Sequence, residues 1–180
     1  MRFVTDGFAR ASFRMLTADM TEVISEIRSE YRIMEKIQRM TQSQRYEVLD
    51  LWLRSTTCDN SFLEANFWEK HYEKIKNDYL TTPDTFVYIV DGVIAGFICI
   101  TNDNFIKGLF VDPKYRGQGI GTKLISFAKE SFSILHVNVY TKNRAMIDFA
   151  THMGFIIDGA RLHSSTGEIQ YRMIWNENNM

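Results

Sequence analysis

The chain is short of the residues that mark secreted, membrane-spanning or metal-binding proteins. It has two cysteines and two prolines, and no apolar stretch approaches the roughly 20 residues that cross a bilayer. The histidines are scattered, and neither cysteine lies near other ligands at zinc spacing. The amino-terminal segment has no apolar central region, which argues against a secretory signal. We therefore expect a cytoplasmic protein without a metal ion or a membrane partner.

An excess of either charge is also missing. Lys and Arg number 21 against 22 Asp and Glu, which gives a formal net charge of −1. A nucleic acid is therefore an unexpected partner, because affinity for its phosphates depends on basic residues. What the chain does have is 45% apolar and 13% aromatic residues. This composition indicates a globular protein with an aromatic-rich core or pocket.

Hydrophobic periodicity divides the chain into a short extension and one domain. Over residues 18–33, apolar side chains recur at helical spacing opposite a charged face, which predicts an amphipathic helix. This helix either docks on the domain or forms a homodimer contact. Residues 34–180 carry the remaining pattern, and their length suits a single domain with its own core. We therefore expect an extension over 1–33 and one domain over 34–180.

The domain pattern predicts a mixed α/β (α+β) protein. Alternating or apolar runs predict seven strands, at about 35–40, 84–90, 93–101, 105–111, 134–140, 155–163 and 169–175. Helices are expected after a capping box at Thr41 and Gln44, after Ser61, over 119–132 and over 143–153. The first helix is expected to bury Tyr46, Leu49, Trp52 and Leu53. This order of elements predicts a mixed sheet covered by four helices.

The most informative segment is the glycine-rich run Arg116-Gly117-Gln118-Gly119-Ile120-Gly121, which leads into the helix over 119–132. Alternate glycines let the backbone turn tightly and approach a ligand without intervening Cβ atoms. The first amides of the following helix are unpaired, its dipole favours an anion, and Arg116 adds a positive charge. The segment therefore predicts a phosphate or pyrophosphate site.

Three kinds of phosphate-binding loop compete for this pattern. A Walker loop ends in Gly-Lys-Ser/Thr, whereas Gly121 is followed by Thr122 and Lys123 in the reverse order. A dinucleotide fingerprint has the form Gly-x-Gly-x-x-Gly, and the glycines here are spaced too evenly and lie too far from the first strand. The remaining form is Arg/Gln-x-x-Gly-x-Gly, which Arg116, Gly119 and Gly121 satisfy.

On these residues the chain resembles the GNAT superfamily of N-acetyltransferases, and in particular a small bacterial branch. The resemblance covers about residues 34–180. It includes the preceding Leu109-Phe110-Val111-Asp112-Pro113, the following Val139-Tyr140, and a helix reading Leu51-Trp52-Leu53-Arg54-Ser55-Thr56-Thr57. It implies a mostly antiparallel GNAT sheet and transfer of acetyl from acetyl-CoA to a primary amine, by direct attack in a ternary complex. The acceptor is then a lysine side chain, a protein N-terminus or a small amine.

The resemblance also implies where the cosubstrate lies. A bulged fourth strand places the backbone of Leu109, Phe110 and Val111 along the pantetheine arm, and we assign the amide that polarises the thioester to Phe110. The pyrophosphate is expected on the loop and the first helical turn, formed by Arg116, Gly117, Gln118, Gly119, Ile120, Gly121 and Thr122. Asn143 matches a pantetheine-binding asparagine and also suits a helix cap. Phe149 matches an aromatic position beside the cofactor and suits the core equally well.

The sequence departs from the family pattern where a proton donor is expected. The tyrosine that usually protonates the departing CoA thiolate is replaced by Ala150. Tyr140 is the preferred substitute and His152 the weaker one. On the acceptor side, Asn60 and Gln170 stand where relatives often have His and Glu. Their replacements could come from Glu64, His71, Glu168 and Tyr171.

These departures keep two other functions open. One is a catalytically weak acyl-CoA-binding sensor or assembly module. The other is a toxin-like enzyme acting on charged tRNA, which requires a basic surface from Arg28, Arg32, Lys36, Arg39, Arg45 and Arg54. The aromatic stripe Trp68, Tyr72 and Tyr79 is expected in the core, and Phe62 is the better candidate for a substrate pocket.

Overall fold

The structure is a computed structural model of the chain, and it describes residues 35–59, 62–63, 67–80 and 84–179. The expected helix over 18–33 lies outside these residues, as do Asn60, Glu64 and the helix start at Ser61. Among the described residues, no helix combines the length and apolarity that a membrane crossing requires. The same residues contain no group of three His, Cys, Asp or Glu side chains placed to hold a metal ion.

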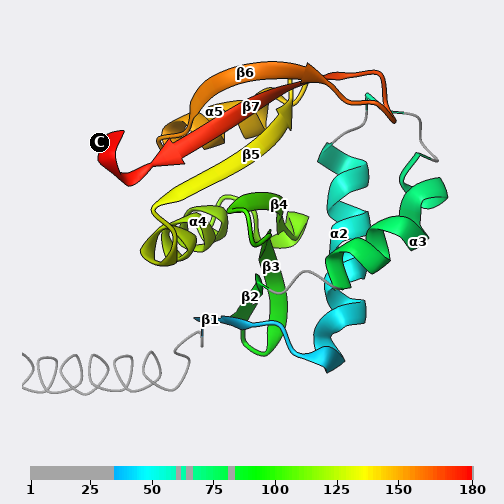
Figure 1. The fold of residues 1–180 in the computed structure, drawn as a ribbon. Coiled ribbons are helices and arrows are strands. Elements are labelled where there is room, and N and C mark those ends of the chain that lie inside the picture. Colours follow the sequence, from blue (N-terminus) through cyan, green and yellow to red (C-terminus); the bar gives the residue numbers. More distant parts are fainter. Residues whose placement is uncertain (1–34, 60–61, 64–66, 81–83, 180) are drawn as a thin grey trace, which may run out of the picture. The chain divides into compact units, whose positions relative to one another are not determined.

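One seven-stranded sheet organises the described residues, in the order β1-β2-β3-β4-β5-β7-β6 (Figure 1). Every neighbouring pair is antiparallel except β4 and β5, which are parallel. The predicted mixed, mostly antiparallel sheet is therefore confirmed. The strands are β1 (Glu35–Arg39), β2 (Asp84–Val90), β3 (Val93–Ile100), β4 (Phe105–Val111), β5 (Ile134–Tyr140), β6 (Ile156–Leu162) and β7 (Ile169–Asn176).

Four α-helices accompany the sheet in the described part of the chain: α2 (Arg45–Asp59), α3 (Phe67–Leu80), α4 (Ile120–Ser131) and α5 (Arg144–His152). Before α2, the Thr41 N–H donates to Gln44 Oε1 at 2.9 Å, as the capping pattern predicts. The prediction that Tyr46 is buried is wrong, because its side chain is 75% exposed. Helix α2 is rotated so that its buried face runs through Val48, Leu49, Leu51 and Trp52.

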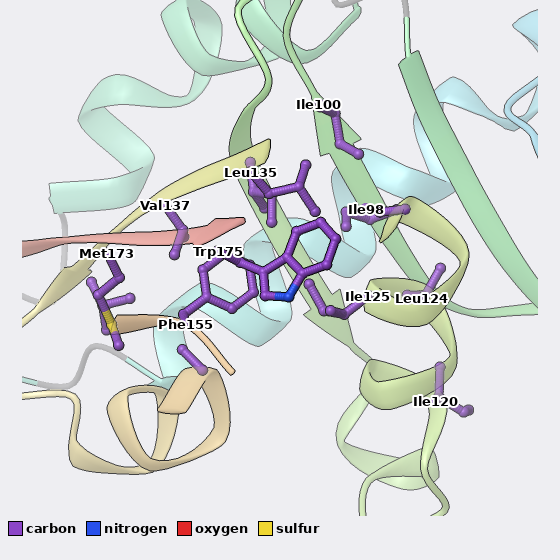
Figure 2. Packing of buried hydrophobic residues seen from close by; sticks show 14 of the residues in the cluster. Ile98, Ile100, Ile120, Leu124, Ile125, Leu135, Val137, Phe155, Met173 and Trp175 are labelled. Atoms are coloured by element: carbon purple, nitrogen blue, oxygen red, sulfur yellow. The ribbon is translucent and has the colours of Figure 1, made fainter. Parts of the chain in front are cut away.

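The sheet has a separate hydrophobic cluster on each face. On one face, side chains of α4 and α5 pack against the sheet, and Figure 2 shows Ile125 of α4 beside Trp175 of β7. On the other face, Val48, Leu51 and Trp52 of α2 pack against Val87, Ile94 and Phe97, with Trp68 and Tyr72 of α3 alongside. Successive strand residues point to opposite faces, so β3 and β4 contribute to both clusters.

Candidate active site

Strand β4 contains a bulge that bends it away from regular pairing. Ile106 pairs with Ile100 and Gly108 pairs with Cys99, so Lys107 is an extra residue opposite β3. An extra residue bends its strand and increases the local twist. The bulge lies immediately before the segment Leu109-Phe110-Val111, as the resemblance implies.

Beyond the bulge, β4 and β5 separate. They pair at two positions only, Phe105 with His136 and Ile106 with Val137. Strand β5 continues to Tyr140 and is paired with β7 along its whole length. The end of β4 therefore faces β5 without ladder hydrogen bonds, which leaves backbone groups of both strands directed into the opening.

The register of β3 and β4 decides which amides face this opening. In an antiparallel pair, alternate residues exchange hydrogen bonds with the partner strand and the residues between them point away. Asp112 N–H donates to the carbonyl of Ala95 at 2.9 Å, so Phe110, two residues earlier, also faces β3. Leu109 and Val111 face the opening. We expected the catalytic amide from Phe110, but this register gives that orientation to the N–H groups of Leu109 and Val111.

A cavity of about 540 Å³ occupies the opening. On the α4 and α5 face it is lined by Gly121, Asn143, Met146 and Phe149. On the α2 and α3 face it is lined by Trp52, Thr56, Trp68, Phe110, Tyr140, His163 and Gln170. Its volume suits a small-molecule site. Because one cavity reaches both faces of the sheet, two substrates can approach each other from opposite sides.

The glycine loop lies at the α4 end of this cavity. Gly117 and Gly119 have φ angles of 75° and 77°, in the left-handed region that favours glycine. Gly119 is the N-cap of α4, so the first amides of this helix have no partner within it. Arg116 Nε donates to Val111 O at 3.2 Å, which holds this side chain at the end of β4. The backbone geometry is that of an anion site at a helix N-terminus.

Several expected site residues do not line the cavity. Arg116 and Gly121 of the loop reach it, whereas Gly117, Gln118, Gly119 and Thr122 are exposed beside it and the Ile120 side chain is buried in the core. A Cβ atom at Gly121 would lie 3.3 Å from Phe149 Cζ, so glycine at this position keeps α4 close to α5. The outer loop residues can therefore contribute through their backbone amides rather than through side chains.

Helix α5 presents two of the expected residues. Asn143 Oδ1 accepts from Met146 N–H at 3.1 Å, which confirms the capping role, and the same residue lines the cavity. Phe149 packs against the core cluster and also lines the cavity. Ala150 is buried in the core at 2% exposure, and His152 is exposed and does not line the cavity. Neither supplies a proton donor there.

Tyr140 ends β5 and lines the cavity on the α2 and α3 face. Its ring lies edge-on to Phe62 at 5.4 Å and to His163 at 5.7 Å. Burial raises the pKa of the Tyr140 hydroxyl above its ordinary value, against hydrogen bonds from Thr166 and Gln170. The hydroxyl therefore keeps its proton at neutral pH, and the side chain lines the opening.

The acceptor-side residues differ from those expected. Tyr171 packs against the opposite face and Glu168 accepts from Lys142 Nζ at 2.7 Å, and neither lines the cavity. The side chains of Glu64 and His71 lie outside the described part. Trp68, expected only in the core, also lines the cavity, and His163 lines it without having been predicted. His163 follows β6 in a turn, where no periodic signal could have identified it.

Comparison with known proteins agrees with this geometry. The profile of the Acetyltransferase (GNAT) family matches residues 45–155. The peptidyl-lysine N-acetyltransferase YiaC of Escherichia coli is 31% identical over 139 residues, which are 77% of this chain and 95% of the relative. The peptidyl-lysine N-acetyltransferase YjaB of Salmonella typhimurium is 30% identical over 128 residues, which are 71% of this chain and 87% of the relative.

Solved structures share the fold. Apo YjaB from Escherichia coli superposes with a TM-score of 0.70 at 22% identity, covering 79% of this chain and 98% of that one. The ribosomal-protein-S18-alanine N-acetyltransferase from Escherichia coli superposes with a TM-score of 0.62 at 18% identity, covering 79% of this chain and 94% of that one. With the family profile matched over more than half of its length, the chain belongs to the GNAT acetyltransferase family.

Proposed function

We propose that this chain transfers acetyl from acetyl-CoA to the side-chain amine of a peptidyl lysine, by direct attack within a ternary complex. The observation that carries the proposal is the single cavity that passes between β4 and β5 and is lined from both faces of the sheet. Such a cavity lets donor and acceptor meet without exchanging places. Two relatives named peptidyl-lysine N-acetyltransferases support lysine as the acceptor.

The α4 and α5 end of the cavity fits a CoA thioester. The first amides of α4, with Arg116 beside them, would hold the pyrophosphate. The backbone groups of Leu109 and Val111 that face the opening would pair with the amides of the pantetheine arm, as a neighbouring strand would. Asn143 and Phe149 line the same end and would contact that arm from α5.

The acyl chemistry then follows from two groups in the opening. The Leu109 N–H would donate to the thioester oxygen and stabilise the negative charge that develops there during attack. The neutral amine nitrogen bonds to the acetyl carbon, the C–S bond breaks, and the departing sulfur takes the proton of Tyr140. The nitrogen then loses a proton, which restores Tyr140 through solvent. A thiolate is a workable leaving group because a free thiol has a pKa of about 8.5.

A second function, the acyl-CoA-binding sensor, is favoured by Ala150, which is buried and carries no proton donor. Tyr140 at the cavity favours the enzyme instead. The tRNA-directed reading has less support, because Arg39 pairs with Asp84 at 2.8 Å and Arg54 pairs with Asp112 at 3.1 Å. These ion pairs reduce the positive charge that a tRNA surface requires.

The direct test is calorimetric titration with acetyl-CoA, followed by measurement of CoA thiol released with a lysine peptide. Gly119→Glu is expected to weaken acetyl-CoA binding at least tenfold, because it places a carboxylate at the proposed anion site. Gly92→Glu is the matched control. Gly92 has a similar φ of 83° and no atom within 4 Å of an added Cβ, but it lies in the turn between β2 and β3.

Two results contradict parts of the proposal. Equal acetyl-CoA binding by the wild type and Gly119→Glu contradicts the loop assignment. Tight acetyl-CoA binding without thiol release, across peptides and small amines, supports the sensor instead of the enzyme.

A further inference from the structure

The acceptor end of the cavity poses a recognition problem. An amine substrate is usually expected to meet a carboxylate, yet the described residues that line the cavity include no Asp or Glu. The wall at this end consists of the rings of Trp52, Trp68, Phe110 and Tyr140 together with a few polar side chains. Among the described residues, the groups at this end that can bind an amine nitrogen do so through neutral hydrogen bonds.

Gln170 supplies one such group. It lies directly opposite Tyr140 in the β5–β7 register, so both side chains project from the same face of the sheet. It is only 7% exposed, and its Oε1 atom has no hydrogen-bond partner among the described residues. Burying an unpaired carbonyl oxygen destabilises a folded protein, so native structures contain few of them. Because Gln170 lines the cavity, this unpaired oxygen is a candidate partner for a donor that a ligand brings.

Trp68 supplies a group of the opposite kind. Its Nε1–H is buried without a partner among the described residues, and its ring lines the same cavity. An unpaired indole N–H is not by itself a site, since Trp175 has one too. Trp175, however, is packed in the α4 and α5 core at 3% exposure (Figure 2). It is not among the residues that line the cavity. The position of Trp68 in the cavity wall is what distinguishes it.

We propose that Gln170 Oε1 accepts an N–H of the acceptor nitrogen and that Trp68 Nε1 donates to a carbonyl of the same acceptor molecule. The site then selects acceptors that carry both an amine and an amide carbonyl, as a peptide does, over simple alkyl amines. This inference rests on the proposed function. It adds two residues that bind the acceptor, at a site whose described lining has no carboxylate: the acceptor satisfies two polar atoms that are otherwise buried without a partner among the described residues.

The test measures binding rather than turnover. The probes are CoA alone, CoA joined through an S-acetyl linker to the Nε of Nα-acetyl-lysine methylamide, and CoA joined through the same linker to butylamine. In the wild type, the lysine conjugate is expected to bind more tightly than the butyl conjugate. Gln170→Met is expected to weaken both conjugates roughly tenfold and leave CoA unchanged. Gln170→Glu keeps a side-chain oxygen at the same distance from the backbone. It is expected to recover most of the conjugate affinity that Gln170→Met loses.

Trp68→Phe tests the contact proposed for Trp68 Nε1 separately from the contact proposed for Gln170 Oε1. It keeps an aromatic ring against Trp52 but removes the N–H, so it is expected to abolish the preference for the lysine conjugate over the butyl conjugate. Trp175→Phe and Gln38→Met are matched controls, since they make the same changes away from the cavity, and both are expected to bind all three probes as the wild type does.

Two outcomes overturn the inference and can be told apart. Normal CoA binding with unchanged conjugate affinities in Gln170→Met and Trp68→Phe overturns the inference and leaves the proposed function standing. Failure of the wild type to bind CoA or any conjugate overturns the proposed function, and the inference with it.

Discussion

At the scale of single residues, we propose that the hydroxyl of Tyr140 takes the role of the tyrosine that Ala150 replaces. Ala150 is buried in the core and offers no proton. Tyr140 comes from a different element and the opposite side of the opening, yet it lines the same cavity. Because burial raises the pKa of its hydroxyl, Tyr140 remains a donor under conditions in which a thiolate leaves. Under this proposal, the general acid comes from β5 instead of α5, and the proposed thioester site is unchanged.

Removing this hydroxyl tests that role. Tyr140→Phe is expected to lower kcat for acetyl transfer about 100-fold, the usual size of a general-acid contribution, and to leave the Kd of acetyl-CoA unchanged. Steady-state kinetics with a lysine peptide, alongside calorimetric titration, gives both values. Tyr171→Phe is the matched control, because Tyr171 is on the neighbouring strand and packs against the other face. An unchanged kcat in Tyr140→Phe would show that the thiolate leaves without this acid.

The pH dependence of kcat follows from the same shift. A raised pKa means that Tyr140 stays protonated as the pH increases past neutrality, and it loses its proton only above the ordinary tyrosine value of about 10. Wild-type kcat is therefore expected to show no decrease between about pH 7 and pH 9. A decrease within that range in the wild type, absent from Tyr140→Phe, would contradict the direction of the shift.

At the scale of elements, the position of α4 depends on one small residue of β3. A Cβ atom at Gly96 would lie 2.9 Å from the Phe110 carbonyl oxygen and 3.1 Å from Ile120 Cγ2. The first contact is with backbone, which cannot move without shifting β4. Gly96 therefore lets the start of α4 lie close against the strand that carries the bulge. The anion site and the opened strand are brought together by this close approach.

Gly96→Ala is expected to move the start of α4 away from β4. The added methyl group should lower the free energy of unfolding by about 1–3 kcal/mol, the usual cost of overpacking. It should also weaken acetyl-CoA binding, because Ile120 begins the helix that we propose binds the pyrophosphate. Chemical denaturation and calorimetric titration measure the two effects. A variant with wild-type stability and affinity would show that the strand and helix have room that the structure does not indicate.

At the scale of the whole molecule, one polar cluster ties the edge of the sheet to α4. Lys123 of α4 donates to Glu35 of β1 and, at 2.7 Å, to the hydroxyl of Tyr88 on β2. The Tyr88 hydroxyl also donates to the Glu35 carboxylate. The hydrogen bond from Lys123, and to a smaller extent that from Tyr88, lowers the pKa of Glu35 below its ordinary value. The carboxylate is therefore favoured in the folded state, and its contribution to stability is present above the unfolded pKa and lost as pH falls through the folded one.

Glu35→Gln is expected to lower the thermal midpoint near neutral pH. The difference in thermal midpoint between Glu35→Gln and the wild type should shrink as the pH falls through the lowered pKa of Glu35. At that pH the wild type loses the ionised carboxylate that the variant lacks. Thermal unfolding followed by circular dichroism from about pH 7 down to about pH 3 measures this. Glu130→Gln, an exposed change on α4, serves as the control. A difference that stays constant with pH would contradict the assignment.

Much of this molecule could be predicted from local patterns. Alternating or apolar runs predicted the seven strands, including the close pair at 84–90 and 93–101, and the spacing of Arg116, Gly119 and Gly121 predicted the loop before α4. Each of these signals depends on residues close together in the sequence. The chemistry of glycine and of helix N-termini is local as well.

What could not be predicted depends on contacts between distant segments. Which of Leu109 and Phe110 faces the opening is decided by the register with β3, and that register depends on the bulge at Lys107. Whether Tyr46 is buried is decided by the rotation of α2 against the sheet. Trp68 belongs both to the core and to the cavity because the cavity reaches the face covered by α2 and α3.

The two rungs that join β4 to β5 have a consequence for the sheet itself. Strands β1 to β4 form one hydrogen-bonded group, and strands β5, β7 and β6 form another. Only two paired positions join β4 to β5 at the boundary between the groups. A linear molecule bearing amide groups, laid along that boundary, would take the place of the rungs that the protein omits. Catalysis and completion of the β-sheet would then be the same event.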